Sequence, residues 1–366
     1  MKMGLTQQDA RLYIGGGCQE IIVPGMQVHS RAFAYPNMPA VLLDTLYGTR
    51  EELYGKALKR DFSSFESLYH SFLENLRALI AQMVAVFTPY DQLQKQINPE
   101  LLSSTLTKDC IERGQDATDD GARYYHTTLS LVGFGTTCDS LLAIRQLVYE
   151  EQKISLSALC ASMKQNFADN AQITAILQNR KERYGNDTET AKEFVDQLAK
   201  QLCTVTDGLK NGRGTPWTIS LFNYYNFQRQ GQYTGATPDG RKAGEPFSRG
   251  FGPSDQNVGE NGLTAAALAA SAGCSAPFTD TAILDLALQM GNLPVDSLVS
   301  YIKACMKLKI PSLQLNVVKK EQLLEEQAHP GTHPNLIVRI CGFSARFGSL
   351  PKNVQDEVIS RLPKEG

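Results

Sequence analysis

A long run of apolar residues at helical spacing constrains the fold of this chain most. Between residues 65 and 87 the apolar side chains recur every three or four positions, at Phe65, Leu68, Phe72, Leu76, Leu79, Ile80, Met83 and Phe87. Ser63 and Glu66 form a capping box ahead of this run, and Pro89 is expected to end it. The sequence therefore predicts one long amphipathic helix. The chain has 366 residues, which is enough for a sizeable core or for two domains.

Short runs rich in Val, Ile and Leu alternate with further helical segments. Strands are predicted at residues 21–23, 313–318 and 336–340, the last two as buried strands. Amphipathic helices are predicted at residues 140–152, 189–203, 298–308 and 351–362. Strands mixed with long helices indicate the α/β class.

Charge and hydropathy exclude several classes of function. The net charge is −2, with 36 Lys and Arg against 38 Asp and Glu, so no basic excess suggests a nucleic-acid partner. The chain has no uninterrupted apolar run of about 18 residues, the length of a membrane span. The polar N-terminus does not resemble a secretory signal. We therefore expect a cytoplasmic protein that binds neither nucleic acid nor membrane.

The eight cysteines give no sign of a metal site. They form no C-x-x-C pair, and no histidine lies at zinc-finger spacing from them. We expect reduced thiols, mostly buried as small apolar side chains, with no bound metal and no tightly bound cofactor.

A single glycine follows the last predicted strand. Residues 336–340 lead into Cys341 and Gly342, and Phe343 comes next. A glycine there can simply turn the chain where φ must be positive. Glycine also suits a second role, because a radical on its Cα is stabilised by the amide nitrogen and the carbonyl together. Such a centre is nearly planar, and a side chain would crowd it.

The residues around Gly342 resemble a known signature. Arg339-Ile-Cys-Gly342-Phe343, followed by Leu350 and then by the string 355–361, resembles the glycyl radical signature of the pyruvate formate-lyase superfamily. Ile340 and Phe343 replace the usual Val and Tyr. The resemblance implies a radical stored on Gly342 and anaerobic metabolism. It also implies a partner, an activating enzyme that uses S-adenosylmethionine and an iron–sulfur cluster to install the radical.

A second motif lies near the start of the chain. Gly17-Cys18-Gln19-Glu20 resembles the Gly-Cys-x-Glu loop of glycyl radical dehydratases. The resemblance implies that Cys18 carries a thiyl radical and that Glu20 is the general base. A carboxylate in a dry pocket has its pKa raised toward neutrality, which suits that role. Pyruvate formate-lyases proper have two adjacent cysteines, whereas Gly17 precedes Cys18 here. This difference favours a lyase or dehydratase acting on a small organic substrate.

The resemblance covers nearly the whole chain but only the C-terminal half of the family's length. The string 235–246 is a long match whose Asp and Gly residues build turns. The resemblance implies a barrel part at 1–235 and a glycyl radical domain at 236–366. The family fold implies half of a β/α barrel of about ten strands, with the cysteine loop and the glycyl loop inside it. We expect a truncated or split chain whose partner is a missing N-terminal half, or a homodimer.

Several assignments stay open at the level of sequence. His29 and Tyr35 follow the cysteine loop closely and are candidate substrate-binding residues. A formate acetyltransferase would need a further acyl-accepting thiol, for which Cys138, Cys274 and Cys341 are candidates. Arylacetate-type decarboxylation is another alternative. A non-catalytic fragment, or a rescue subunit that restores the radical of a damaged partner, is the alternative outside catalysis.

Overall fold

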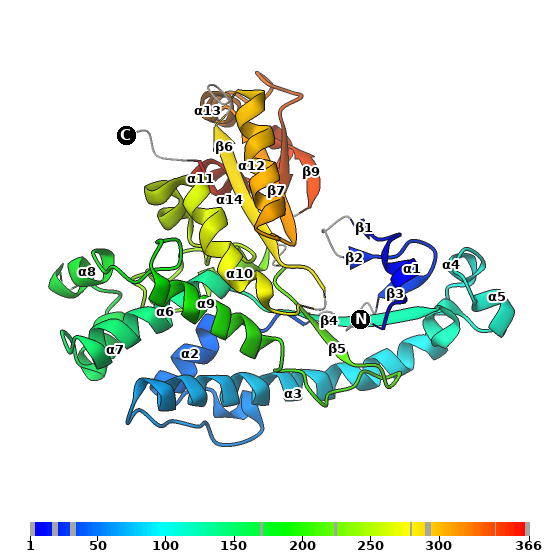
Figure 1. Cartoon of the computed structure of the whole chain (residues 1–366), viewed down its shortest axis with the longest axis horizontal. Helices are drawn as coiled ribbons and strands as arrows, with labels where there is room; N and C mark the ends of the chain where they lie inside the picture. Colours follow the sequence, from blue (N-terminus) through cyan, green and yellow to red (C-terminus); the bar gives the residue numbers. More distant parts are fainter. Residues whose placement is uncertain are drawn as a thin grey trace.

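A curved array of parallel strands organises the molecule (Figure 1). β3 (Gln27–His29), β4 (Tyr124–Ser130) and β5 (Trp217–Ser220) pair in that order. A single parallel bridge from Leu221 to Ala282 joins the end of β5 to the start of β6 (Ile283–Gln289), which pairs in parallel with β7 (Ser312–Val318). The arc agrees with the predicted half-barrel.

Helices connect these parallel strands, as parallel pairing requires. The computed structural model describes residues 4–16, 21–29, 34–168, 171–222, 225–278, 280–289, 294–340 and 342–362. Its connecting helices are α2 (Met38–Tyr47), α3 (Phe65–Ile97), α4 (Leu101–Thr105) and α5 (Cys110–Arg113) before β4; α6 (Phe134–Ala143), α7 (Leu156–Lys164), α8 (Ala171–Gln178) and α9 (Glu189–Leu202) before β5; α10 (Asn226–Gln232) and α11 (Asp255–Ala272) before β6; and α12 (Val295–Lys307) before β7.

Two antiparallel hairpins flank the arc. Near the start, after α1 (Gln7–Ala10), β1 (Ile14–Gly15) pairs with β2 (Ile21–Ile22). Near the end, after α13 (Lys320–Ala328), β8 (Ile337–Ile340) pairs with β9 (Phe343–Arg346), and α14 (Lys352–Ser360) follows. The string 16–20, which includes the predicted cysteine loop, therefore connects one hairpin, and Cys341 with Gly342 connects the other.

The long helix α3 differs from its prediction at both ends. Its N-cap is Ser64, whose side chain accepts a hydrogen bond from the Ser67 N–H, and Ser63 lies one residue outside. Pro89 does not end the helix, which continues to Ile97. The hydroxyl of Thr88 donates to the Val84 carbonyl at 2.8 Å. Beyond the proline, Asp91 is fully buried and accepts a 2.6 Å hydrogen bond from the Tyr125 hydroxyl, so tertiary contacts hold the second half of α3.

The two faces of the central strands have different chemistry. On one face, Leu129 of β4 and Trp217 and Ile219 of β5 belong to the main apolar core, together with the first half of α3. On the other face, His126, Thr128 and Ser130 alternate along β4, opposite Thr218 and Ser220 of β5. These polar side chains are buried as well. One face is thus built for packing and the other is lined with hydrogen-bonding groups.

A second apolar core lies under the C-terminal segment. It includes Val338 and Ile340 of β8, Phe347, and Val354 and Val358 of α14. The string 355–361 holds α14 in place, because Arg361 donates two 2.7 Å hydrogen bonds to Glu357 and lies 3.6 Å from Asp285 of β6. β7 and β8 are each buried mainly on one side, since Val317 is 43% and Ile337 is 50% exposed, so the prediction of two buried strands was wrong about their second faces. The domain boundary after residue 235 stays a prediction.

Most of the other predicted elements lie near their expected residues. β2, β7, α9, α12 and α14 lie at or close to their predicted residues. The helix predicted at 140–152 begins earlier, at Phe134, and its second half, Ile144–Glu150, is π-helical. β4 and β5 were missed because their polar residues give no apolar run. In the part of the chain that the structure describes, no helix is long and apolar enough to span a membrane.

Replacing the proline inside α3 should stabilise the protein. In Pro89→Ala the helix regains a backbone N–H and loses the clash of the ring with the preceding turn, so we expect the free energy of unfolding to rise by about 1–3 kcal/mol. Urea unfolding followed by circular dichroism measures the change. Val86→Ala, at a site that is 71% exposed in the same helix, should stay within about 0.5 kcal/mol. A destabilised Pro89→Ala variant would show that the proline is required for the path of α3.

Candidate radical site

The turn between β8 and β9 requires a glycine. Ile340 pairs directly with Phe343, so only residues 341 and 342 connect the strands. Gly342 is buried and has φ of 100°, in the region that two-residue hairpin loops favour and that side chains disfavour. The turn alone therefore explains why residue 342 is a glycine. As a result, a Cα that bears no side chain lies in a buried position.

The side chain of Asn316 holds this hairpin against the arc, and the side chain of Arg339 braces its turn. The amide of Asn316 on β7 accepts a 2.7 Å hydrogen bond from the Arg339 N–H and donates a 2.8 Å bond to the Arg339 carbonyl. The Arg339 guanidinium donates to the carbonyl of Gly342 and, at 3.4 Å, to the Ser344 hydroxyl. A chain of contacts thus runs from the parallel strands to the predicted radical residue, and a cation lies against its carbonyl.

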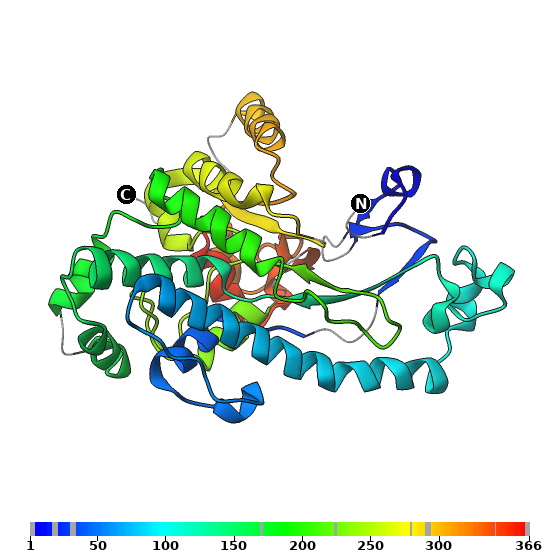
Figure 2. The same ribbon diagram turned by 60° about the horizontal axis from the view of Figure 1, so that its bottom comes forward.

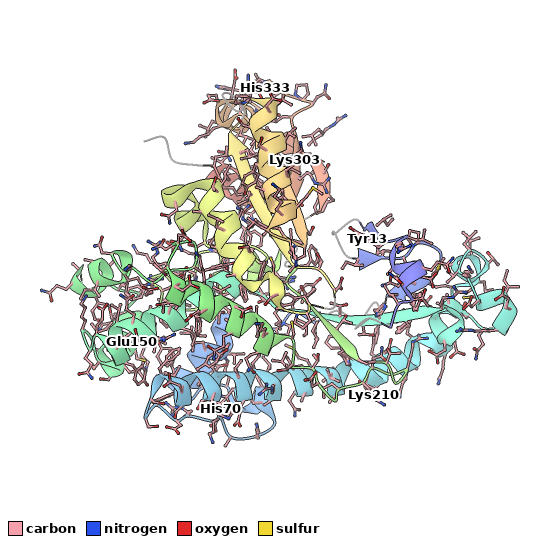
Figure 3. All side chains as sticks on the ribbon, viewed as in Figure 1. Tyr13, His70, Glu150, Lys210, Lys303 and His333 are labelled. Carbon is pink, nitrogen blue, oxygen red and sulfur yellow. The ribbon has the colours of Figure 1, made fainter. Side chains whose placement is uncertain are left out.

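A cavity of about 500 Å³ opens between this hairpin, the β6–β7 pair and the N-terminal hairpin. Its described lining residues come from all three regions: Tyr13, Ile14, Gly15, Gly16 and Ile21; Asp280 and Thr281; Pro311, Ser312, Leu313, Gln314 and Leu315; and Arg339. Figure 3 shows Tyr13 on the side of the N-terminal segment that faces the β6–β7 pair. Gly16 and Ile21 immediately flank residues 17–20, and Arg339 lies three residues before Gly342. The described residues on both sides of the predicted cysteine loop and one residue of the glycine hairpin therefore line the same cavity.

Hydrogen bonds tie the N-terminal hairpin to the central strands. The carboxylate of Asp280, which is 4% exposed, accepts from the Ile21 N–H at 3.4 Å and from the Thr128 hydroxyl at 2.8 Å. Thr128 in turn lies 2.7 Å from the Thr218 hydroxyl. Sequence reasoning missed these three polar residues. The signal that could have found Thr128 and Thr218 is the alternation of polar side chains at 126, 128 and 130 and at 218 and 220.

The structure describes some of the predicted site residues and not others. Gly342 lies in the turn described above. Cys18 and Glu20 lie outside the described residues. His29 is the last residue of β3, with its backbone paired to His126. The Tyr35 carbonyl accepts a 2.9 Å hydrogen bond from Gln230, and its side chain packs against the second core. The roles of His29 and Tyr35 stay predictions.

Two alternative thiols are poorly placed for acyl transfer. Cys138 is fully buried within the main core, and burial, together with the charge of Asp139, raises the pKa of its thiol well above the usual value. Burial raises the pKa of Cys274 to about 12, and its thiol lies 3.2 Å from the Ala270 carbonyl. A thiol held protonated is a weak nucleophile. Neither residue lines the cavity beside Arg339. Cys341 lies outside the described residues.

The loop at 235–246 has a structural role. The guanidinium of Arg241 donates to the carbonyls of Thr234, Gly235, Lys242 and Glu245, all within the same loop or at its edge. Asp239 accepts from the Ser140 hydroxyl at 3.2 Å. These bonds fold the loop onto itself and onto α6. Across the described residues, no group of three His, Cys, Asp or Glu side chains is arranged to hold a metal ion.

Two family models assign the chain to the glycyl radical proteins. The chain belongs to the pyruvate formate lyase-like family, whose model matches residues 1–228, and the glycine radical model matches residues 270–348. A domain of the latter kind carries a radical introduced after synthesis.

Relatives with known activities are longer. Trans-4-hydroxy-L-proline dehydratase from Clostridioides difficile is 29% identical over 371 residues, which cover 99% of this chain and 47% of that protein. (2S)-3-sulfopropanediol dehydratase from Klebsiella oxytoca is 27% identical, with coverage of 99% and 45%. A solved structure on 1,2-propanediol dehydration in Roseburia inulinivorans has a TM-score of 0.89 at 27% identity, covering 99% of this chain and 47% of its own. The chain thus spans about half the length of these relatives, and the predicted fold and family are confirmed.

Removing the amide that holds β8 should destabilise the glycine hairpin. In Asn316→Ala the backbone N–H and carbonyl of Arg339 lose their partners in a partly buried place, so we expect a loss of about 1–3 kcal/mol in the free energy of unfolding. Urea unfolding measures this loss, and limited proteolysis after residue 339 should become faster. Asn179→Ala, the same substitution at an exposed helix end, should change stability by less than about 0.5 kcal/mol. Equal effects at the two sites would contradict the role of Asn316.

Proposed function

We propose that this chain is the radical-bearing half of a glycyl radical enzyme of the dehydratase or lyase type. Gly342 stores the radical, Cys18 is the thiyl-radical residue and Glu20 is the general base. The observation that supports this proposal is the shared cavity, which is bordered by the residues on both sides of the cysteine loop and by Arg339 of the glycine hairpin.

The hairpin is suited to a radical on Gly342. The activating partner, an enzyme that uses S-adenosylmethionine and an iron–sulfur cluster, removes one hydrogen atom from the Gly342 Cα. The remaining unpaired electron is shared between the amide nitrogen and the carbonyl of the peptide. The Arg339 guanidinium donates to that carbonyl and so strengthens its electron withdrawal. Burial of Gly342 keeps the centre away from solvent.

The reaction then needs one thiol and one carboxylate. The Cys18 thiol gives its hydrogen atom to the Gly342 Cα, and the resulting thiyl radical takes a hydrogen atom from a substrate carbon. Glu20 accepts the proton of the hydroxyl on that carbon. The neighbouring carbon loses its leaving group with the bonding electron pair, and the leaving group takes up the proton from Glu20. The product radical then takes the hydrogen atom back from Cys18. The Cys18 thiyl radical finally recovers the hydrogen atom from Gly342, which restores the glycyl radical, so no external oxidant or reductant is consumed.

The substrate that we propose is a small molecule with a hydroxyl group next to the carbon that is attacked. The names of the relatives point to hydroxylated substrates, and Thr128, Thr218 and Asp280 supply hydrogen-bonding groups on the buried polar face. His29 and Tyr35 are retained as proposed substrate contacts. The relatives have further length that this chain does not span, so we propose that turnover needs a complementary chain.

Electron paramagnetic resonance tests the radical site. Incubated without oxygen with an activating enzyme, S-adenosylmethionine and reductant, the chain should give a doublet near the free-electron value, because one α-hydrogen remains on Gly342. Glycine deuterated at Cα should collapse that doublet. Gly342→Ala should give no signal.

A matched glycine separates this result from misfolding. Gly331 has φ of 98° with no atom within 4 Å of an added Cβ, so Gly331→Ala carries similar backbone strain in the same C-terminal segment. It should keep the full signal. A doublet that survives Gly342→Ala would contradict the assignment of the radical, whereas a folded wild-type chain without any signal would remove the catalytic proposal.

Solvent exchange tests the relay to Cys18 without a known substrate. The hydrogen of a thiol exchanges with water, so in D2O each return of a hydrogen atom to Gly342 delivers deuterium, and the doublet should collapse with time. Cys18→Ser should keep a stable doublet, because the stronger O–H bond does not give its hydrogen atom to the glycyl radical. Collapse at the same rate in Cys18→Ser would exclude Cys18 as the relay.

A further inference from the structure

A second cavity, of about 360 Å³, shares no described lining residue with the cavity beside Arg339. Its wall is built by α6, by α8 and the loop after it, by residues 239–248, by the start of α11 and by Ser360 of α14. Figures 1 and 2 show α8 on the opposite side of the central strands from the N-terminal hairpin. The proposed radical chemistry therefore does not account for this cavity.

Three arginines converge on the second cavity from two separate loops. Arg180 and Arg183 follow α8, and Arg241 lies in the loop at 235–246. Each of the three is at most 9% exposed. Arginine is almost never buried to this extent unless its guanidinium has partners. The hydrogen bonds of these side chains therefore indicate what the cavity can bind.

Two guanidinium N–H groups in this wall have no acceptor among the described residues. The terminal nitrogens of Arg241 are held by the four carbonyls of its own loop, so its Nε is the group that is left over. Arg180 donates to the carbonyls of Leu177 and Asp239 at 2.7 and 2.8 Å, and its other terminal nitrogen lies 3.5 Å from Asp139. The Arg180 Nε is buried and is again left over. Both groups are donors that carry positive charge.

The carboxylates in the same wall are already engaged. Each of them accepts a hydrogen bond from the protein: Asp139 from the Tyr184 N–H and the Asn257 amide, Asp239 from the Ser140 hydroxyl, Asp255 from the Arg249 guanidinium, and Glu245 from the Lys242 N–H. The wall therefore needs acceptors more than it needs donors.

The charge of the wall points the same way. Burial lowers the pKa of Arg180 and that of Arg241 in spite of the carboxylates nearby, so these carboxylates do not fully balance the two cations. Burial also raises the pKa of Asp139 to about 6, so this group holds its negative charge less firmly than an exposed carboxylate does. A ligand that brings negative charge is therefore favoured.

We propose that this cavity binds a small molecule through an oxyanion group, a carboxylate or a phosphate. The oxygens of that group accept hydrogen bonds from Nε of Arg180 and of Arg241, since guanidinium groups suit both kinds of anion. Leu177 and Phe247, which are buried in the same wall, contact the rest of the molecule. Because Ser360 also lines the cavity, the bound molecule links the loop after α8 to the C-terminal helix.

Isothermal titration calorimetry of the full chain with inorganic phosphate tests this site. The wild type should show one saturable site. Arg180→Lys should weaken binding by about tenfold or more, because lysine keeps the charge beside Asp139 but lacks the Nε donor. Arg145→Lys is the matched control, since Arg145 also pairs with a carboxylate, Glu150 at 2.8 Å, but lies outside the cavity wall. It should keep the wild-type affinity.

A second variant should change the affinity in the opposite direction. Glu245→Gln removes a negative charge from the wall and can still accept the hydrogen bond of the Lys242 N–H, so it should tighten phosphate binding by about two- to fivefold. Glu193→Gln, at an exposed position on α9, should leave the affinity unchanged. Because Glu245 is exposed, this test holds even if Arg180→Lys does not fold.

Parallel titrations with acetate at the same ionic strength distinguish the two anions. Tighter binding of acetate assigns the site to carboxylic acids, and tighter binding of phosphate assigns it to phosphorylated molecules. Three results would overturn the proposal: no saturable heat with either anion, equal affinity of Arg180→Lys and the wild type, or weaker binding by Glu245→Gln. None of these measurements needs the radical, so this proposal and the proposed function fail independently.

Discussion

The pairing of one side-chain amide with one backbone residue joins the glycine hairpin to the rest of the protein. Asn316 satisfies both the N–H and the carbonyl of Arg339, so it substitutes for a strand pairing between β7 and β8. Because β7 is paired to β6 along its whole length, the position of the hairpin follows from the parallel strands. Arg339 then fixes the turn itself through the Gly342 carbonyl.

The central strands carry the second constraint. Their apolar face rests on α3 and α9 in the main core, whereas their other face holds buried hydroxyl groups and the Asp280 carboxylate. Burying polar groups costs free energy unless they are hydrogen-bonded, so packing alone does not explain a polar face of this kind. It also carries the bond to the Ile21 N–H, which positions the hairpin that flanks the cysteine loop.

Some parts of this protein could be predicted from its sequence and others could not. Helices such as α9 and α12, and the strand β7, are encoded locally in the spacing of apolar residues, and their positions along the chain were predicted closely. β4 and β5 were missed because half of their residues face a polar interior, which removes the apolar run. The extent of α3 depends on contacts of Asp91 with residues distant in sequence, so the local effect of Pro89 was overestimated. Gly342 is proposed as the radical residue from its motif alone, whereas the clamp by Asn316 and the Asp280 network depend on tertiary geometry.

The second core gives damage at Gly342 a structural consequence. The segment after this residue contributes Phe347, Val354 and Val358 to that core, and Arg361 contributes the contact with Asp285. If oxygen cut the chain at a glycyl radical, the segment that separates would hold a large part of the core beneath β8. The break would therefore weaken the second core and unfold β8, β9 and α14. The inactivated molecule would then be open to proteolysis.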